Sequence, residues 1–161
     1  MNKKLSLTVT IVTVVYVLIL ITFLFVLRVR FADAQLPFVD YVKAHTNLIP
    51  FVTLGEYVRR LAVDTINVET VIYNVVGNIV LFIPFGFIFP FFFEKLRKFL
   101  PYAAVSAASV VAVEIMQLLL RCGSFDVDDI ILNLVGAAIG FGVFLILKKV
   151  NDIKTGSGVA E

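Results

Sequence analysis

Four long stretches of this sequence contain almost no charged side chain, and each is long enough to cross a lipid bilayer. They are residues 5–27, 71–93, 101–120 and 130–147, and the one charged residue within them is Glu114. A helix needs about 20 mostly apolar residues to cross the hydrocarbon core, with about 17 as the lower limit. The chain is 60% hydrophobic and 16% charged over 161 residues, more apolar surface than a water-soluble domain of this length can bury. The sequence therefore predicts an all-α integral membrane protein, a bundle of four transmembrane helices.

The one long loop between these stretches has a helical pattern of its own. Residues 28–70 contain Thr53 and Glu56 at the spacing of a capping box, followed by apolar residues interleaved with charged ones. The pattern predicts a short amphipathic helix, which either lies on the outer interface or packs on the bundle as an ordinary connection. We expect residues 1–154 to form a single membrane domain and residues 155–161 to form a flexible tail.

The basic residues predict the orientation of the chain. With both termini in the cytoplasm, that side carries eight lysines and arginines. The outer side then carries six, spread over about twice as many residues, so the positive-inside rule favours this orientation. The first stretch resembles a signal peptide, because Ala32-Asp33-Ala34 after it looks like a cleavage site. Its apolar core is much longer than the roughly 7–15 residues of a signal peptide, so we expect a retained helix.

Polar side chains lie at one common depth in the last three stretches. Asn74 and Asn78 are near the start of the second stretch, Glu114 and Gln117 near the end of the third, and Asn133 near the start of the fourth. Because successive membrane helices alternate in direction, these positions fall on the same side of the membrane. Burying such groups in hydrocarbon costs on the order of several kcal/mol unless they meet one another or water. We therefore expect one polar pocket that opens to the cell exterior.

Helical spacing adds three charged residues to this candidate pocket. Arg121 continues the helical face of Glu114, and Asp126 and Asp129 precede Asn133 at steps of three and four residues. Buried polar groups can also serve only to hold helices together, at about 1 kcal/mol each. A carboxyl group accompanied by several amides is more than such a role requires, so the pattern favours a functional site.

The aspartates before the fourth stretch have simpler interpretations as well. Asp126 occupies the position of a helix N-cap, and Asp128 is interpreted as a solvated side chain. Together with Asp129 and Glu114 they offer oxygen ligands for a divalent cation, but their spacing matches no EF-hand. We therefore expect no metal ion and no cofactor.

Prolines and glycines in the second and fourth stretches influence how the helices pack. Pro84 removes a backbone donor and predicts a kink, which is either a hinge beneath the pocket or a proline that membrane helices simply tolerate. Pro90 is expected to end the same helix. Gly136 and Gly140 form a small-xxx-small pattern that lets two helices approach closely, and we expect it to act within the bundle.

Four short motifs resemble the VanZ-like family of small bacterial membrane proteins. They are Asn47-Leu48-Ile49-Pro50-Phe51, the run Gly77-Asn78-Ile79-Val80-Leu81-Phe82-Ile83-Pro84-Phe85-Gly86, Glu114-Ile115-Met116-Gln117, and Asp126 to Asn133 with Gly136 and Gly140. The ordered set covers roughly residues 47–147. The site positions that the resemblance carries over are Asn78, Glu114, Gln117, Asp126, Asp129 and Asn133. The assignment of Asn74 and Arg121 to the site depends on helical spacing alone. Asp128 falls between the matched acids.

The resemblance implies a multi-pass protein of the bacterial cell membrane. The namesake of the family is associated with low-level resistance to the glycopeptide antibiotic teicoplanin. We therefore expect the outward-facing pocket to recognise a lipoglycopeptide antibiotic or a lipid-linked component of the cell envelope. Arg121 is available to pair with a phosphate group of such a ligand. The expected partners are membrane lipids and such a ligand, and not nucleic acid, since the net charge is only +2.

Two other functions stay open from the sequence. The chain is an enzyme acting on a lipid headgroup if Glu114 serves as general base and Asp126 or Asp129 as a second carboxylate. Against this, the sequence contains no evident Ser-His or Cys-His pair and no phosphate-binding glycine loop. Alternatively, the polar residues only hold together a structural or assembly protein. The sequence thus favours a binding protein over an enzyme.

Overall fold

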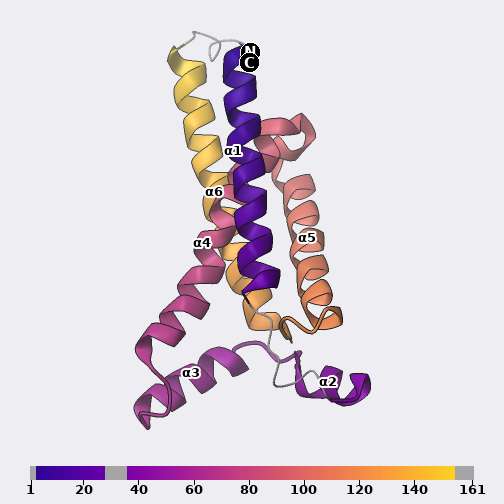
Figure 1. The fold of residues 1–161 in the computed structure, drawn as a ribbon. Helices are drawn as coiled ribbons and strands as arrows, with labels where there is room; N and C mark the ends of the chain where they lie inside the picture. Colours follow the sequence, from indigo (N-terminus) through magenta and orange to yellow (C-terminus); the bar gives the residue numbers. More distant parts are fainter. Residues whose placement is uncertain (1–2, 28–35, 155–161) are drawn as a thin grey trace. The chain divides into compact units, whose positions relative to one another are not determined.

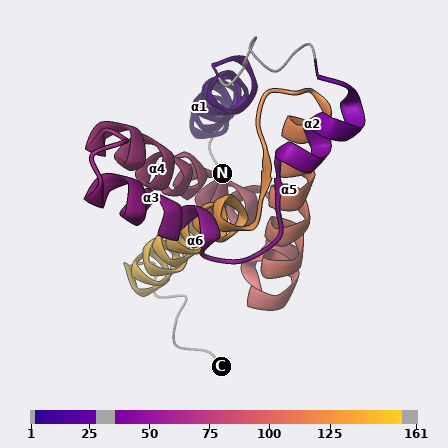
Figure 2. The same cartoon turned by 90° about the horizontal axis from the view of Figure 1, so that it is seen from below.

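The structure, a computed structural model, describes residues 3–27 and 36–154 (Figures 1 and 2). The predicted flexible tail, residues 155–161, lies outside this range. Most of the described chain is helical, and the elements in order are α1 (Lys3–Ile21), the π-helical turn η1 (Thr22–Val26), α2 (Phe38–Ala44), β1 (Thr46–Asn47), α3 (Val52–Ala62), α4 (Val68–Phe92), the 3-10 turn η3 (Glu94–Arg97), α5 (Phe99–Leu119), β2 (Phe125–Asp126) and α6 (Val127–Lys154).

Four helical segments of the described chain are long and apolar enough to cross a membrane. They are Leu7–Val26, Val68–Phe92, Phe99–Leu119 and Val127–Lys154. This confirms the prediction of an all-α membrane protein with four transmembrane helices. The fourth helix is longer than its apolar stretch, because it includes the acidic residues before residue 130 and the basic residues after residue 147.

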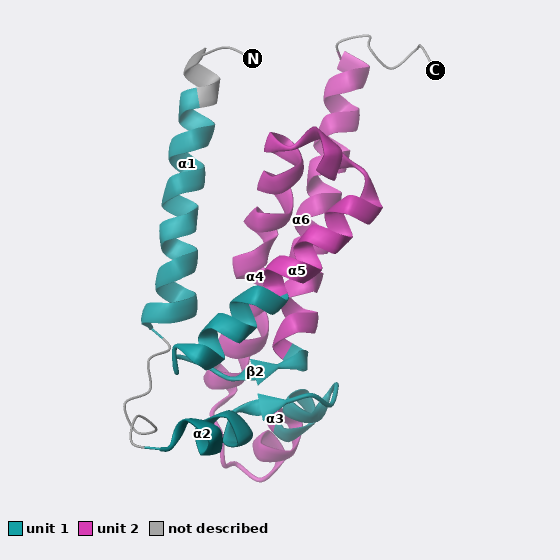
Figure 3. Cartoon of the chain, turned by 90° about the vertical axis from the view of Figure 1, so that its right-hand side faces the viewer, with its two compact units in different colours: residues 1–56, 111–128 teal, residues 57–110, 129–161 magenta. Residues whose placement is uncertain are grey.

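The chain divides into two compact units, and each is described by itself. Unit 1 comprises residues 1–56 and 111–128, and unit 2 comprises residues 57–110 and 129–161 (Figure 3). The helices α3, α5 and α6 each continue along the chain from one unit into the other. The single membrane domain expected over residues 1–154 stays a prediction.

In unit 1, the segment after α2 pairs with the segment that leads into α6. α2 begins after Pro37, whose fixed φ suits a helix start, and has Asp40 in its first turn. β1 and β2 form a parallel pair in which Thr46 lies opposite Phe125 and Asn47 opposite Asp126. The Phe125 amide also donates to the His45 carbonyl at 2.9 Å. Since residues 46–47 and 125–126 are in contact, both segments lie on the same side of a membrane, as the predicted topology requires.

In unit 2, α4 and α6 pack with their backbones in contact at glycines. A Cβ atom built on Gly136 would lie 2.1 Å from the Ile79 carbonyl oxygen, and one built on Gly140 would lie 1.9 Å from that of Ile83. A Cβ on Gly86 would lie 2.0 Å from the Ala137 carbonyl oxygen. No side chain fits at such distances. The small-xxx-small pattern therefore acts between two helices of this chain, as predicted.

The start of α5 is attached to the seam that Gly86, Gly136 and Gly140 form between α4 and α6 in unit 2. The Tyr102 hydroxyl donates to the Ala137 carbonyl at 2.6 Å, and the Tyr102 ring stacks on Phe141 with centroids 4.0 Å apart. Both rings are buried. Tyr102 thus satisfies its hydroxyl inside an apolar bundle while its ring fills space beside α6.

The helix α4 continues through both of its prolines. Pro84 and Pro90 are interior residues of Val68–Phe92, so the prediction that Pro90 ends the helix was wrong by two residues. A proline at position 90 cannot donate to the preceding turn, but its carbonyl is used: Arg97 Nε donates to it at 3.2 Å. Arg97 also forms an ion pair with Glu94 at 3.2 Å, which orders the turn η3.

The amphipathic helix expected in the long loop is α3, but its predicted capping box was wrong. The helix begins at Val52, so Thr53 lies inside the first turn and is not the N-cap. The Thr53 hydroxyl instead donates to Asp126 Oδ2 at 2.6 Å. The first turn is capped by a residue that is distant in sequence, Asp128.

Candidate functional site

Asp126 is the centre of a polar cluster in unit 1. Its carboxylate accepts hydrogen bonds from Asn47 Nδ2 at 3.1 Å, from the Thr53 hydroxyl at 2.6 Å and from the Asp128 amide at 2.9 Å. The bond from the residue two positions later is that of an N-cap, as expected for Asp126 at the start of α6. The same carboxylate therefore caps α6 and anchors Asn47 at the end of β1.

Asp128 is fully buried and caps α3. Its carboxylate accepts hydrogen bonds from the amides of Phe51, at 2.5 Å, and Leu54, at 3.0 Å. The prediction that Asp128 is a solvated side chain was therefore wrong. Phe51 has a φ of 67°, a left-handed conformation that a bulky residue adopts only when its surroundings hold it there. The Asp128 carboxylate supplies one such restraint.

Replacing Asp128 with alanine should release the start of α3. Both amides would lose a charged acceptor, so we expect hydrogen exchange at Phe51 and Leu54 to rise about tenfold, in line with the loss of a buried cap. The exposed Asp40, changed to alanine in α2, is the matched control. Exchange is measured residue by residue. An equal rise along α4 and α6 would indicate global destabilisation and contradict this local role.

Glu114 and Gln117 are buried on α5 within unit 1. Their exposed fractions are 1% and 0%. Gln117 Nε2 donates to the Leu24 carbonyl at 2.9 Å, at the π-helical turn η1, where backbone carbonyls depart from the regular ladder. Gln117 Oε1 accepts no hydrogen bond within the described part of the chain. A buried amide oxygen without a donor costs about 1–3 kcal/mol. A hydrogen-bond donor from outside the described chain would therefore be stabilising at this position.

Arg121 lies beyond α5 and faces α2. The helix ends at Leu119, and Arg121 has a φ of 54°, so the helical spacing used to place it beside Glu114 does not apply. Its guanidinium donates to the Leu36 carbonyl at 2.9 Å and lies over the rings of Phe38 and Tyr41, 5.7 and 5.3 Å from their centroids. These contacts position Arg121 as a link between the end of α5 and the start of α2.

A second group of polar residues lies in unit 2. Asn78 Nδ2 donates to Asp129 Oδ1 at 2.6 Å, and Asn78 is only 1% exposed. The pair joins α4 to the first turns of α6, where a carboxylate is also favoured by the helix dipole. Asn133, one turn further along α6, is buried as well. Asn74 is half-buried and donates to the Thr70 carbonyl of its own helix at 2.7 Å.

The predicted site residues therefore fall into two groups. Glu114, Gln117, Arg121 and Asp126 belong to unit 1, whereas Asn74, Asn78, Asp129 and Asn133 belong to unit 2. Within these groups the structure joins Asn78 to Asp129, and it places Glu114, Gln117, Asp126 and Asn133 in buried positions. That all eight line one pocket stays a prediction.

Sequence reasoning missed Asn47, Thr53 and Asp128 as members of the polar cluster. In the sequence, Asn47 stands out only as part of a motif, and the spacing of Thr53 and Glu56 predicts a local cap. One signal was present: Thr53 and Asp128, side chains capable of capping, lie in the first turns of α3 and α6. Asp128 could therefore have been considered as the cap of α3.

Comparisons with known proteins agree with this architecture. The VanZ/LLP1 family matches residues 13–148 of the chain. One relative is protein VanZ of Enterococcus faecium, which is 28% identical over 114 residues, or 71% of this chain and 61% of that protein. The aligned part is thus less than two thirds of that relative's length. No solved structure matches the chain significantly. Because the family match extends from the first membrane helix into the last, this chain belongs to the VanZ/LLP1 family.

Proposed function

We propose that this membrane protein of the VanZ/LLP1 family recognises the polar part of a lipoglycopeptide antibiotic or of a lipid-linked envelope component at the outer face of a bacterial membrane. In this proposal, binding of the ligand by the protein contributes to resistance of the teicoplanin kind. The observation that carries the proposal is Gln117, whose amide is fully buried while its oxygen accepts nothing within the described chain. Glycopeptides and envelope precursors are rich in amide and hydroxyl donors, which such an acceptor would bind.

The neighbouring carboxyl group supports the same proposal. Glu114 is buried in the apolar α5 three residues before Gln117, so both side chains lie on one helical face. An ionisable residue inside a membrane segment is expensive and is a functional-site hypothesis by default. A carboxyl group and an amide on one face can accept several hydrogen bonds from a sugar or peptide, which fixes a ligand's orientation.

Replacing Glu114 with glutamine in a susceptible bacterial host tests this function. We expect the teicoplanin concentration that inhibits growth to fall to the level of the empty vector, because the substitution keeps the shape of the side chain but replaces one carboxyl oxygen with an amide NH2 group, which cannot accept a hydrogen bond. Glu69→Gln, at an exposed acid in the first turn of α4, should change nothing. Membrane abundance of each variant is measured in parallel. Full resistance of Glu114→Gln at normal abundance would exclude this residue from the working site.

A further inference from the structure

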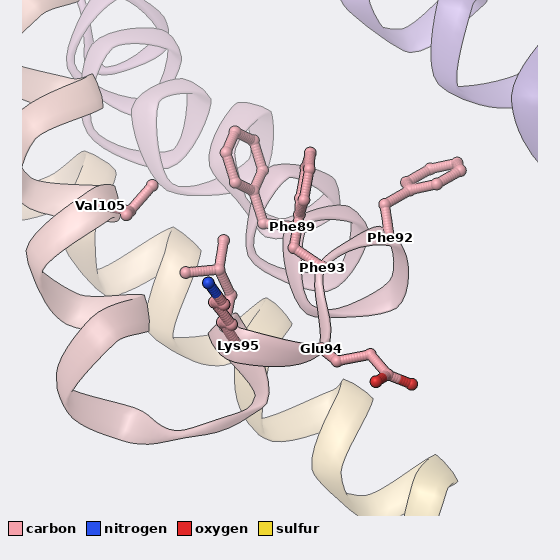
Figure 4. Close-up of a pocket in the computed structure, with 7 residues that line it drawn as sticks. Phe89, Phe92, Phe93, Glu94, Lys95 and Val105 are labelled. Atoms are coloured by element: carbon pink, nitrogen blue, oxygen red, sulfur yellow. The ribbon is translucent and has the colours of Figure 1, made fainter.

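The turn between α4 and α5 in unit 2 borders an apolar hollow. None of the candidate site residues described above lines it. The hollow has a volume of about 640 Å³ and is lined by Phe89, Phe92, Phe93, Leu96 and Val105, with Glu94 and Lys95 at the turn (Figure 4). Phe92 and Phe93 are exposed. All of these residues belong to one unit, so the hollow is complete within it.

One cation at this hollow, Lys95, has no partner among the described residues. Arg97 is engaged by Glu94 and by the Pro90 carbonyl, whereas the Lys95 ammonium makes no ion pair or hydrogen bond with any described residue. Figure 4 shows the Lys95 side chain turned toward the Val105 side of the hollow, and the Glu94 carboxylate projecting away from it. The segment 94–98 as a whole carries three bases against one acid. The electrostatics therefore favour an anion beside Lys95.

The position along the chain identifies what such an anion is attached to. The hollow lies where the candidate span Val68–Phe92 ends and before the span Phe99–Leu119 begins. This is the level at which lipid phosphates meet the hydrocarbon core, and an apolar groove with a basic residue at that level matches a phospholipid with one acyl chain. The predicted orientation puts this turn in the cytoplasmic leaflet, where anionic lipids attract basic residues.

We propose that this hollow is a binding site for an anionic phospholipid, with an acyl chain against the phenylalanines and the headgroup phosphate on Lys95. The site is separate from the proposed recognition of an antibiotic or envelope component and does not depend on it. Phe89 and Phe93, whose rings are tilted with centroids 6.2 Å apart, form the wall for the acyl chain. Lys95 provides the headgroup selectivity.

The test is native mass spectrometry of the full-length chain in detergent, titrated with phosphatidylglycerol or phosphatidylcholine of identical acyl chains. We expect one phosphatidylglycerol to bind more tightly than phosphatidylcholine. Lys95→Gln should weaken phosphatidylglycerol binding about fivefold, the effect of removing one basic contact to an anionic lipid. Lys98→Gln is the matched control: it removes the same charge from the same turn but does not line the hollow.

A second pair of variants tests the acyl chain. Phe93→Ser removes an exposed wall of the hollow and should weaken both lipids, whereas Phe99→Ser, at a more exposed phenylalanine outside the hollow, should not. Soluble glycerol phosphate should not displace the lipid. Equal effects of Lys95→Gln and Lys98→Gln, equal binding of the two lipids, no effect of Phe93→Ser, or displacement by glycerol phosphate would each overturn the proposal.

Discussion

Replacing Gly140 with leucine is expected to abolish accumulation of the folded protein, whereas the same replacement of Gly142 should be tolerated. A Cβ on Gly140 would lie 1.9 Å from the Ile83 carbonyl oxygen and 3.0 Å from the Gly86 Cα. These are backbone atoms of α4, which cannot move aside as a flexible side chain can. A Cβ on Gly142 meets no described atom within 4 Å. The two glycines are two residues apart on one helix, so helix propensity and insertion into the membrane are matched.

The expected loss at Gly140 is large because the helices must separate along the seam. Overpacking a core against side chains costs about 1–3 kcal/mol, and a backbone contact exceeds this, so we expect at least about 3 kcal/mol. Membrane abundance and unfolding in mixed micelles measure it. A second pair repeats the test from α4: Gly86→Leu should fail and Gly77→Leu should not, since only Gly86 faces the partner backbone. Equal stability of the two variants in either pair would contradict the seam.

The features that the sequence predicted correctly are those encoded by neighbouring residues along the chain. The four membrane helices follow from four apolar stretches, and the seam follows from Gly136 and Gly140 at a spacing of four. Each of these inferences needs only helical geometry and the thickness of the membrane.

The features that the sequence did not predict are hydrogen bonds between distant segments. Thr53 and Glu56 satisfy a local capping rule, yet Thr53 bonds to Asp126, 73 residues later, and Asp128 caps α3 instead. Local spacing cannot choose between a near cap and a distant one, because either satisfies the same backbone amides. Arg121 was misplaced for a related reason: its left-handed backbone ends the helical periodicity on which its assignment depended.

Replacing Asn78 with alanine is expected to destabilise unit 2 by about 2 kcal/mol. Its Nδ2 donates to Asp129 Oδ1 at 2.6 Å, and the substitution deprives a carboxylate of a charge-assisted hydrogen bond, worth roughly 1.5–3 kcal/mol. Asn74→Ala is the matched control on the same helix, one turn earlier. The Asn74 amide bonds to the Thr70 carbonyl of its own helix and is half-buried, so we expect less than about 0.5 kcal/mol.

A double-mutant cycle of Asn78→Ala and Asp129→Ala isolates the pair. Asp129→Ala alone also removes a negative charge from the first turns of α6, where the helix dipole favours it, and the cycle cancels that contribution. We expect a coupling free energy of at least about 1 kcal/mol from unfolding in mixed micelles, above the average of about 0.6 kcal/mol for hydrogen bonds between membrane helices. Additive losses would show that the two side chains are neighbours without a stabilising bond. Resistance that falls further than membrane abundance in Asn78→Ala would show that the pair also serves ligand recognition, because a purely structural pair lowers both in proportion.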